Sequence, residues 1–236
     1  MALSQTQISQ LYVAIFNRAS EGEGNSFWQT FSSTDSSAEV ATAMLATDAA
    51  QDFFDSSLDS DEAFIEFIYL NTLNKTPADD QAGIDFWVGL LADGESRGEV
   101  VAKLVEAVGT FEDAVADGTA DAATVRAFNQ FNNRVEVSNF TAENLETAPA
   151  DFATSLSFSD DLTVTDDDAT VASAQSSVEA IANPDAPATG LTALLNGLSD
   201  AQTEKADFLD GLELDLNNDG TVDVEAGDAD EDDVAT

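Results

Sequence analysis

The stretch ISQLYVAIFNR, residues 8–18, returns further along the chain as IEFIYLNTLNK, residues 65–75, and this duplication decides the fold. Its apolar side chains recur at i, i+3, i+4, i+7 and i+8, which is the spacing of one face of an α-helix. In the second copy Thr72 takes one of these positions, and the order is otherwise kept. Each copy then continues with an asparagine and a basic residue. We therefore predict an amphipathic helix that ends at the same point in both copies.

The similarity extends beyond these helices. Each helix is followed by a loop that runs to a glycine and then by a Phe-Trp pair, Phe27-Trp28 or Phe86-Trp87. A capping box comes next in each copy, Ser36 with Glu39 and Ser96 with Glu99, which indicates the start of another helix. Two unrelated amphipathic helices would not share all these features in one order. The sequence predicts a mainly α fold in which two tandem helical repeats of about 60 residues pack as an N-terminal domain.

The composition excludes several classes of function. The 236 residues include 47 acidic and 7 basic side chains, which gives a net charge of -40, and no His or Cys is present. This charge repels nucleic acids and anionic membrane surfaces. Without His and Cys, catalytic triads and zinc sites built on imidazole or thiolate cannot form. Such a charge is tolerable where cations are plentiful, outside a cell or inside a halophile. Neither a cleavable signal peptide nor a membrane-spanning segment is expected from the sequence.

The chain divides into two regions by pattern. Residues 1–145 are expected to form the duplicated helical domain, with a helix end at Asn132-Asn133. Residues 146–236 are expected to form a smaller, mixed or helical region with an acidic tail. Its expected elements are short strands near Leu156–Phe158 and Leu162–Val164 and a helix that follows three aspartates, 166–168, and ends at 183–184.

One stretch of the acidic tail has the chemistry of a calcium loop. Oxygen-bearing side chains stand at alternate positions, and Gly220 at the sixth position allows a sharp turn around a hard cation. The predicted ligands are Asp215, Asn217, Asp219, Thr221 and Asp223. Ala226 occupies the twelfth position, where a bidentate acid is usual, so Glu225, Asp228 or a carboxylate from elsewhere would complete the site. The alternative is a solvated acidic tail that binds no metal. We predict Ca2+ as the cofactor, in preference to Mg2+.

A family resemblance rests on the residues of the duplication. Residues 11–18 with Phe27-Trp28, and 69–77 with 82–87, resemble the domain of unknown function 4214. The resemblance covers about residues 1–145 and implies a bacterial surface protein of the S-layer or RTX type, exported by type I secretion. In S-layer relatives a helical N-terminal region anchors the array to polysaccharide, and calcium drives lattice formation. This chain lacks Gly-Gly-x-Gly-x-Asp repeats and a long β-rich domain, so the resemblance implies a compact surface subunit.

Three functions follow as hypotheses. The first is a secreted, calcium-dependent structural protein, not an enzyme, that self-assembles into a layer or filament at the bacterial cell surface. The second is an anchoring or adhesion module that binds surface polysaccharide through the N-terminal helices. The third and weakest is a glycan hydrolase that uses a carboxylate pair such as Glu62 and Glu66. In a chain this acidic, carboxylates at i and i+4 are mostly a solvated helix face, which disfavours the third hypothesis.

Overall fold

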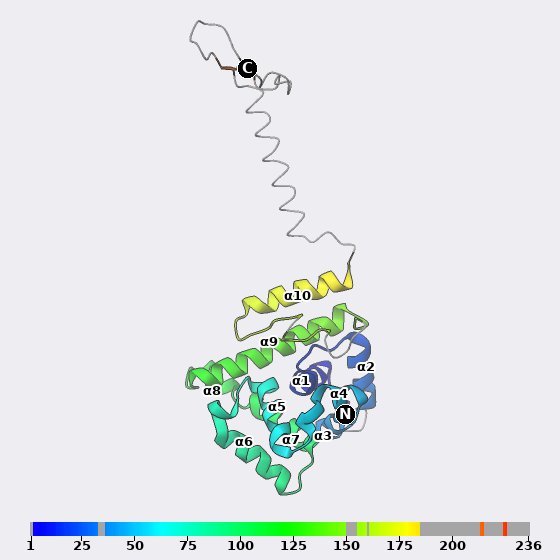
Figure 1. The fold of residues 1–236 in the computed structure, drawn as a ribbon, viewed down its shortest axis with the longest axis vertical. Helices are drawn as coiled ribbons and strands as arrows, with labels where there is room; N and C mark the ends of the chain where they lie inside the picture. The colour runs from blue at the N-terminus through cyan, green and yellow to red at the C-terminus, as the bar shows by residue number, and fades with distance from the viewer. Residues whose placement is uncertain are drawn as a thin grey trace, which may run out of the picture. The chain divides into compact units, whose positions relative to one another are not determined.

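The computed structural model of the chain describes residues 2–32, 36–149, 155–159, 161–184, 213–214 and 224–225. By their contacts, residues 1–184 form one unit and residues 185–236 another. Figure 1 shows the first unit as a body of helices. In the second unit, the short strands β1 (Glu213–Leu214) and β2 (Val224–Glu225) pair in antiparallel fashion, with Glu213 opposite Glu225.

The first unit is mainly helical, so the predicted fold class is confirmed. Its elements, in chain order, are α1 (Gln5–Phe16), α2 (Gly22–Phe31), α3 (Ser37–Leu45), α4 (Asp48–Phe54), the 3-10 helix η1 (Asp55–Leu58), α5 (Asp61–Leu73), α6 (Pro77–Ala92), α7 (Arg97–Gly109), α8 (Glu112–Ala116), α9 (Ala122–Asn144) and α10 (Ala169–Ala182).

The duplication in the sequence is visible in the helices. The order α1, α2, α3 of the first repeat matches the order α5, α6, α7 of the second. Helices α1 and α5 both end at an asparagine in the left-handed conformation, Asn17 at φ 46° and Asn74 at φ 51°. Both predicted capping boxes form, and the backbone N–H groups of Ser36 and Ser96 donate to Glu39 and Glu99 at 2.7 Å.

Helix α1 lies at the centre of the first unit. All its residues from Leu11 to Phe16 are buried, and it contacts α2, α3, α5, α7 and α9. A helix that is apolar on all sides is stable only when other elements surround it. The two repeats also meet directly where α3 packs on α7, and there Gly98 lies against Thr42 and the backbone of Ala38. The core is therefore shared by the repeats.

Helix α9 corrects one sequence-based expectation. A helix end was predicted at Asn132-Asn133, but α9 runs without interruption from Ala122 to Asn144, capped at its start by Asp121. The Asn132 side chain donates to the carbonyl of Phe128, four residues earlier in the same helix. Asn133 is buried and donates to the carbonyl of Thr165 at 3.0 Å. A tertiary contact thus holds Asn133 inside a helix that the propensity of asparagine alone disfavours, and Asn132 is accommodated on the exposed face.

The segment after α9 was expected to contain strands. Among the described residues of that segment the only strand-type pairing is an isolated bridge between Ser157 and Arg18, so the expectation of strands there is wrong. The apolar side chains at alternate positions are nevertheless buried; they are Leu156, Phe158, Leu162 and Val164. They pack against the helical core instead of a sheet. The helix predicted after residues 166–168 is present as α10 and packs on α9.

The described residues after 145, up to the end of α10, pack against the same hydrophobic core as the repeats. The domain boundary predicted after residue 145 remains a prediction. In the described part of the chain, no helix has the length and apolar character needed to cross a membrane.

Candidate functional site

Each repeat contains a polar cluster built from a tyrosine, a basic residue, an acid and a glycine. In the first repeat these residues are Tyr12, Arg18, Glu21 and Gly24, and we call them the first cluster. The Arg18 guanidinium lies 3.2 Å from the Glu21 carboxylate and over the Tyr12 ring. Gly24 lies so close to the Tyr12 hydroxyl and to Glu21 that a side chain at this position would collide with both. The glycine therefore lets the helix approach the tyrosine.

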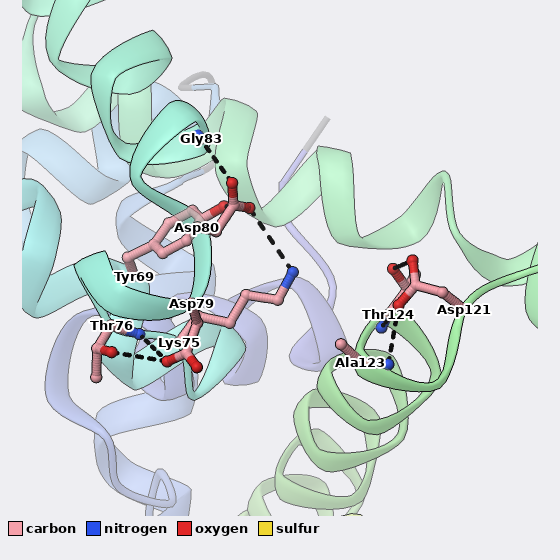
Figure 2. Close-up of polar contacts among 9 residues, drawn as sticks. All are labelled: Tyr69, Lys75, Thr76, Asp79, Asp80, Gly83, Asp121, Ala123 and Thr124. Atoms are coloured by element: carbon pink, nitrogen blue, oxygen red, sulfur yellow. Dashed lines mark hydrogen bonds and ion pairs between the residues drawn. The ribbon is translucent and has the colours of Figure 1, made fainter.

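The second cluster occupies the matching positions Tyr69, Lys75, Asp80 and Gly83. The Tyr69 hydroxyl donates to Asp80 at 2.7 Å, and the Lys75 ammonium lies 3.7 Å from the same carboxylate. Figure 2 shows Asp80 between these groups and the backbone N–H of Gly83, which donates to it at 2.9 Å. Gly83 again lies close to the tyrosine hydroxyl. Duplication has thus preserved a three-dimensional arrangement as well as a sequence pattern.

Asp80 also explains a kink in α6. Its backbone is non-helical, at φ -157° and ψ 67°, and its side chain caps the N–H of Gly83, three residues later. The regular part of α6 therefore begins after Asp80, as α2 begins after Glu21. The hydrogen bond from Tyr69 holds the pKa of Asp80 below its usual value, and burial raises the pKa of Tyr69. At neutral pH the tyrosine is accordingly neutral and the carboxylate charged.

The first cluster is covered by the chain that follows α9. The Gly22 N–H donates to the carbonyl of Leu145 at 2.9 Å, and the Ala19 N–H donates to that of Leu156 at 3.0 Å. The Arg18 side chain donates to the carbonyl of Ser155 at 3.1 Å. These contacts leave Arg18 only 2% exposed. A buried cation is tolerated here because hydrogen bonds and Glu21 replace its water.

A second buried arginine joins the repeats to the covering segment. Arg134 of α9 donates to the Asn17 side chain at 2.9 Å, to the carbonyl of Asn71 at 3.0 Å and to that of Val164 at 3.2 Å. These partners belong to the first repeat, the second repeat and the segment before α10. Burial lowers the pKa of Arg134 to about 10, so the guanidinium is still charged at neutral pH. Arg134 serves as a structural connection.

The second cluster remains at the surface. A cavity of about 200 Å³ opens beside Lys75, lined by polar side chains that include Asp79, Arg126 and Asp166. Figure 2 shows Lys75 between its own repeat and the start of α9, where Asp121 caps the N–H groups of Ala123 and Thr124. The cations are balanced by carboxylates in and around this cavity. It therefore has no surplus positive charge with which to hold an anion.

The Phe-Trp pairs define two aromatic faces. In both pairs the phenylalanine is exposed, with Phe27 at 59% and Phe86 at 58%, and the tryptophan turns toward the core. Trp28 is buried in the core, and Trp87 is partly buried against it. Sequence analysis missed the exposure of the phenylalanines. Figure 1 shows α2 and α6, which carry the pairs, on opposite sides of the first unit.

The two faces differ in shape. On α2 the rings of Phe27 and Phe31 stack with centroids 6.4 Å apart, and both are exposed; we call this pair the α2 face. On α6 a single ring, Phe86, protrudes, and on the following turn Gly89 has open space beside it; we call this the α6 face. One side of the molecule thus carries a double ring and the other a ring beside a gap.

A groove of about 520 Å³ lies between α1, α3 and α7. Its lining combines apolar side chains with amide and charged groups, among them Leu11, Val105, Gln10, Glu99 and Lys103.

The sequence-predicted calcium ligands Asp215, Asn217, Asp219, Thr221 and Asp223 lie outside the described residues. The strands that flank this stretch, β1 and β2, pair with each other. In the ranges that the structure does describe, no three acidic side chains are grouped closely enough to hold a metal ion. The carboxylate pair considered for hydrolysis, Glu62 and Glu66, lies on α5, where Glu62 is exposed and Glu66 half-buried.

Comparison with known proteins gives a family match for one part of the chain. Residues 41–109 match the family described as Domain of unknown function (DUF4214). The match begins within α3 and ends with α7, so the family unit extends from the last part of the first repeat through the second. No curated protein and no solved structure matches the chain.

Proposed function

We propose that the protein is a structural subunit of a bacterial cell surface that self-assembles, in the presence of calcium, into a layer or filament. The observation that carries the proposal is the exposure of a phenylalanine at the same position of both repeats, Phe27 and Phe86. An exposed ring at one position is ordinary, but the same exposure kept in two copies indicates a surface used for contact. Repeated packing modules supply such surfaces in pairs.

The energetics explain why cations are part of the proposal. A phenylalanine buries roughly 150–250 Å² when fully covered, whereas a stable interface buries about 800 Å² on each partner. The rings of Phe27, Phe31 and Phe86 can therefore form the centre of an interface but not the whole of it. A net charge of -40 opposes the approach of two copies. Divalent cations would reduce this repulsion and permit the apolar contact.

The calcium dependence rests on the sequence of the loop from Asp215 to Asp223, and the extracellular location on the family resemblance. In a calcium-rich medium this loop and the many surface carboxylates would be partly occupied. Both features belong to the proposal.

Light scattering at fixed protein concentration tests it. Purified protein is measured in low salt, in 5 mM CaCl2, in 5 mM MgCl2 and in 1 M NaCl, and EGTA is then added to the calcium sample. We expect growth of the scattering mass with calcium and its reversal by EGTA. Growth in 1 M NaCl alone would indicate general screening, which contradicts the specific role of calcium. A monomer in all four conditions would contradict self-assembly.

A second function is favoured by the groove between α1, α3 and α7. Its amide and charged side chains, above apolar groups such as Leu11 and Val105, suit the hydroxyl groups and the faces of a sugar. An anchoring module would use this groove to hold surface polysaccharide. A polysaccharide pull-down with the full chain and with the Gln10→Ala variant tests this function. Loss of retention in the variant supports it, and equal retention or none for the full chain contradicts it.

A further inference from the structure

We infer that copies of this chain join end to end, with the α2 face of one copy docked on the α6 face of the next. This inference rests on the proposed self-assembly and specifies its interface. The occupant of each face is thus a second copy of the chain.

Both aromatic faces lie in stretches of the sequence that contain no charged residue. Charged residues make up 23% of the chain, yet residues 24–34 and 86–92 contain none. These stretches include the rings of the α2 face and of the α6 face. In a molecule that repels itself, the charge-free surfaces are where two copies approach with least cost.

The shapes of the two faces favour contact between unlike faces. The α2 face presents two stacked rings, Phe27 and Phe31. The matching position to Phe31 on α6 is Leu90, which is half-buried, and Gly89 beside it leaves space open. Contact between two α2 faces would bring two pairs of rings together. Contact between two α6 faces would bring the two open spaces together. When an α2 face meets an α6 face, the rings of Phe27 and Phe31 lie against Phe86 and the open space beside Gly89.

The positions of the faces determine the form of the assembly. Helices α2 and α6 lie on opposite sides of the first unit (Figure 1), so one copy can engage a neighbour on each side. A contact between unlike faces is heterologous, and it extends without limit unless the rotation closes a ring. The geometry points to a linear chain of subunits, which can associate sideways into a layer.

Complementary variants test this inference. The double variant Phe27→Ser with Phe31→Ser removes the α2 face, and Phe86→Ser removes the α6 face. With unlike-face contact, each variant alone is monomeric in calcium, and an equimolar mixture forms 1:1 dimers, measured by sedimentation velocity. Dimers of either variant alone would show contact between like faces and overturn the inference. A monomeric mixture would also overturn it, provided that the wild-type chain assembles.

A second substitution tests the α6 face in a variant that does not destabilise the helix, so that a loss of assembly cannot be attributed to misfolding. Gly89→Gln fills the gap of the α6 face, and it replaces a helix-interior glycine, so it favours the folded helix. We expect it to weaken assembly at least tenfold. The matched control is Gly109→Gln, because a side chain at this end of α7 also meets open space but lies in neither face. Equal assembly of both variants would contradict docking at the α6 face. Failure of the wild-type chain to assemble would instead contradict the proposed function.

Discussion

The first and second polar clusters have the same four residue positions but different surroundings. In the first cluster Arg18 and Glu21 are buried beneath the chain that follows α9. In the second cluster Lys75 and Asp80 remain partly exposed, with 20% and 33% of their side-chain surfaces accessible. One repeat has thus become part of the interior, and the other keeps its cluster at the surface.

This difference accounts for the choice of basic residue. The Arg18 guanidinium is planar and presents several donors, so it can bond the carbonyl of Ser155 and face Glu21 at the same time. Lys75 meets solvent and one carboxylate, for which an ammonium group suffices. Duplication therefore preserved the geometry of the cluster, whereas the burial of each copy determines how much its ion pair contributes to stability.

The largest expected effect comes from removing the buried cation. Arg18→Met should destabilise the fold by about 3–5 kcal/mol, because the Glu21 carboxylate would stay buried without its partner. Lys75→Met, at the matching and partly exposed position, should cost at most about 1 kcal/mol. Urea unfolding followed by circular dichroism measures both. Equal losses at the two positions would show that the clusters are energetically alike.

A glycine between the repeats gives the next effect. The second repeat has Gly98 where the first has Ala38, and an added methyl group would collide with Thr42 and with the backbone of Ala38. Gly98→Ala should therefore destabilise the fold by about 1–3 kcal/mol through overpacking. Gly109→Ala, in the same helix and with open space around it, is the control and should be neutral or stabilising. Thermal unfolding of the two variants distinguishes these outcomes.

The capping carboxylate of the second cluster gives a smaller, pH-dependent effect. The folded state lowers the pKa of Asp80, so its charge stabilises the fold at pH values above the unfolded pKa, about 3.9. That contribution is lost as the pH falls through the folded pKa. Asp80→Asn should cost about 1 kcal/mol at pH 7, and the difference from wild type should shrink as the pH falls below the unfolded pKa. A difference that does not change with pH in urea titrations would refute this role.

Replacing the exposed rings should have the smallest effect on folding, and these variants distinguish the stability of the monomer from its assembly. Phe27→Ser and Phe86→Ser replace exposed rings, so each should change the unfolding free energy of the monomer by about 0.5 kcal/mol or less. The same variants should lose assembly. Calorimetry in EGTA, where the chain is expected to be monomeric, measures the first quantity. Strong destabilisation would mean that these rings support the fold of their repeats.

The sequence was sufficient for features that depend on local chemistry. Asn17 and Asn74 end their helices, and Ser36 and Ser96 start theirs, because capping involves only residues within one turn. The DUF4214 resemblance was confirmed for residues 41–109. The predicted calcium loop at Asp215–Asp223 is untested.

Features that depend on distant contacts were not predictable in this way. Asn133 lies on the buried face of α9, and its side-chain amide donates to the carbonyl of Thr165. No local sequence pattern indicates that partner. Leu156 and Phe158 alternate as in a strand but pack on helices. The exposure of Phe27 had one available signal: a neighbouring helical residue lies about 100° away, so the ring next to a core tryptophan faces elsewhere. The packing of α3 on α7 could be recognised only in the structure.

Negative-stain electron microscopy of the full chain with 5 mM calcium and after EGTA tests the central claim most directly. We predict linear assemblies or layers with calcium that disperse into single particles after chelation. Single particles in both conditions, at protein concentrations up to the solubility limit, would contradict the claim that this duplicated helical protein is a building block.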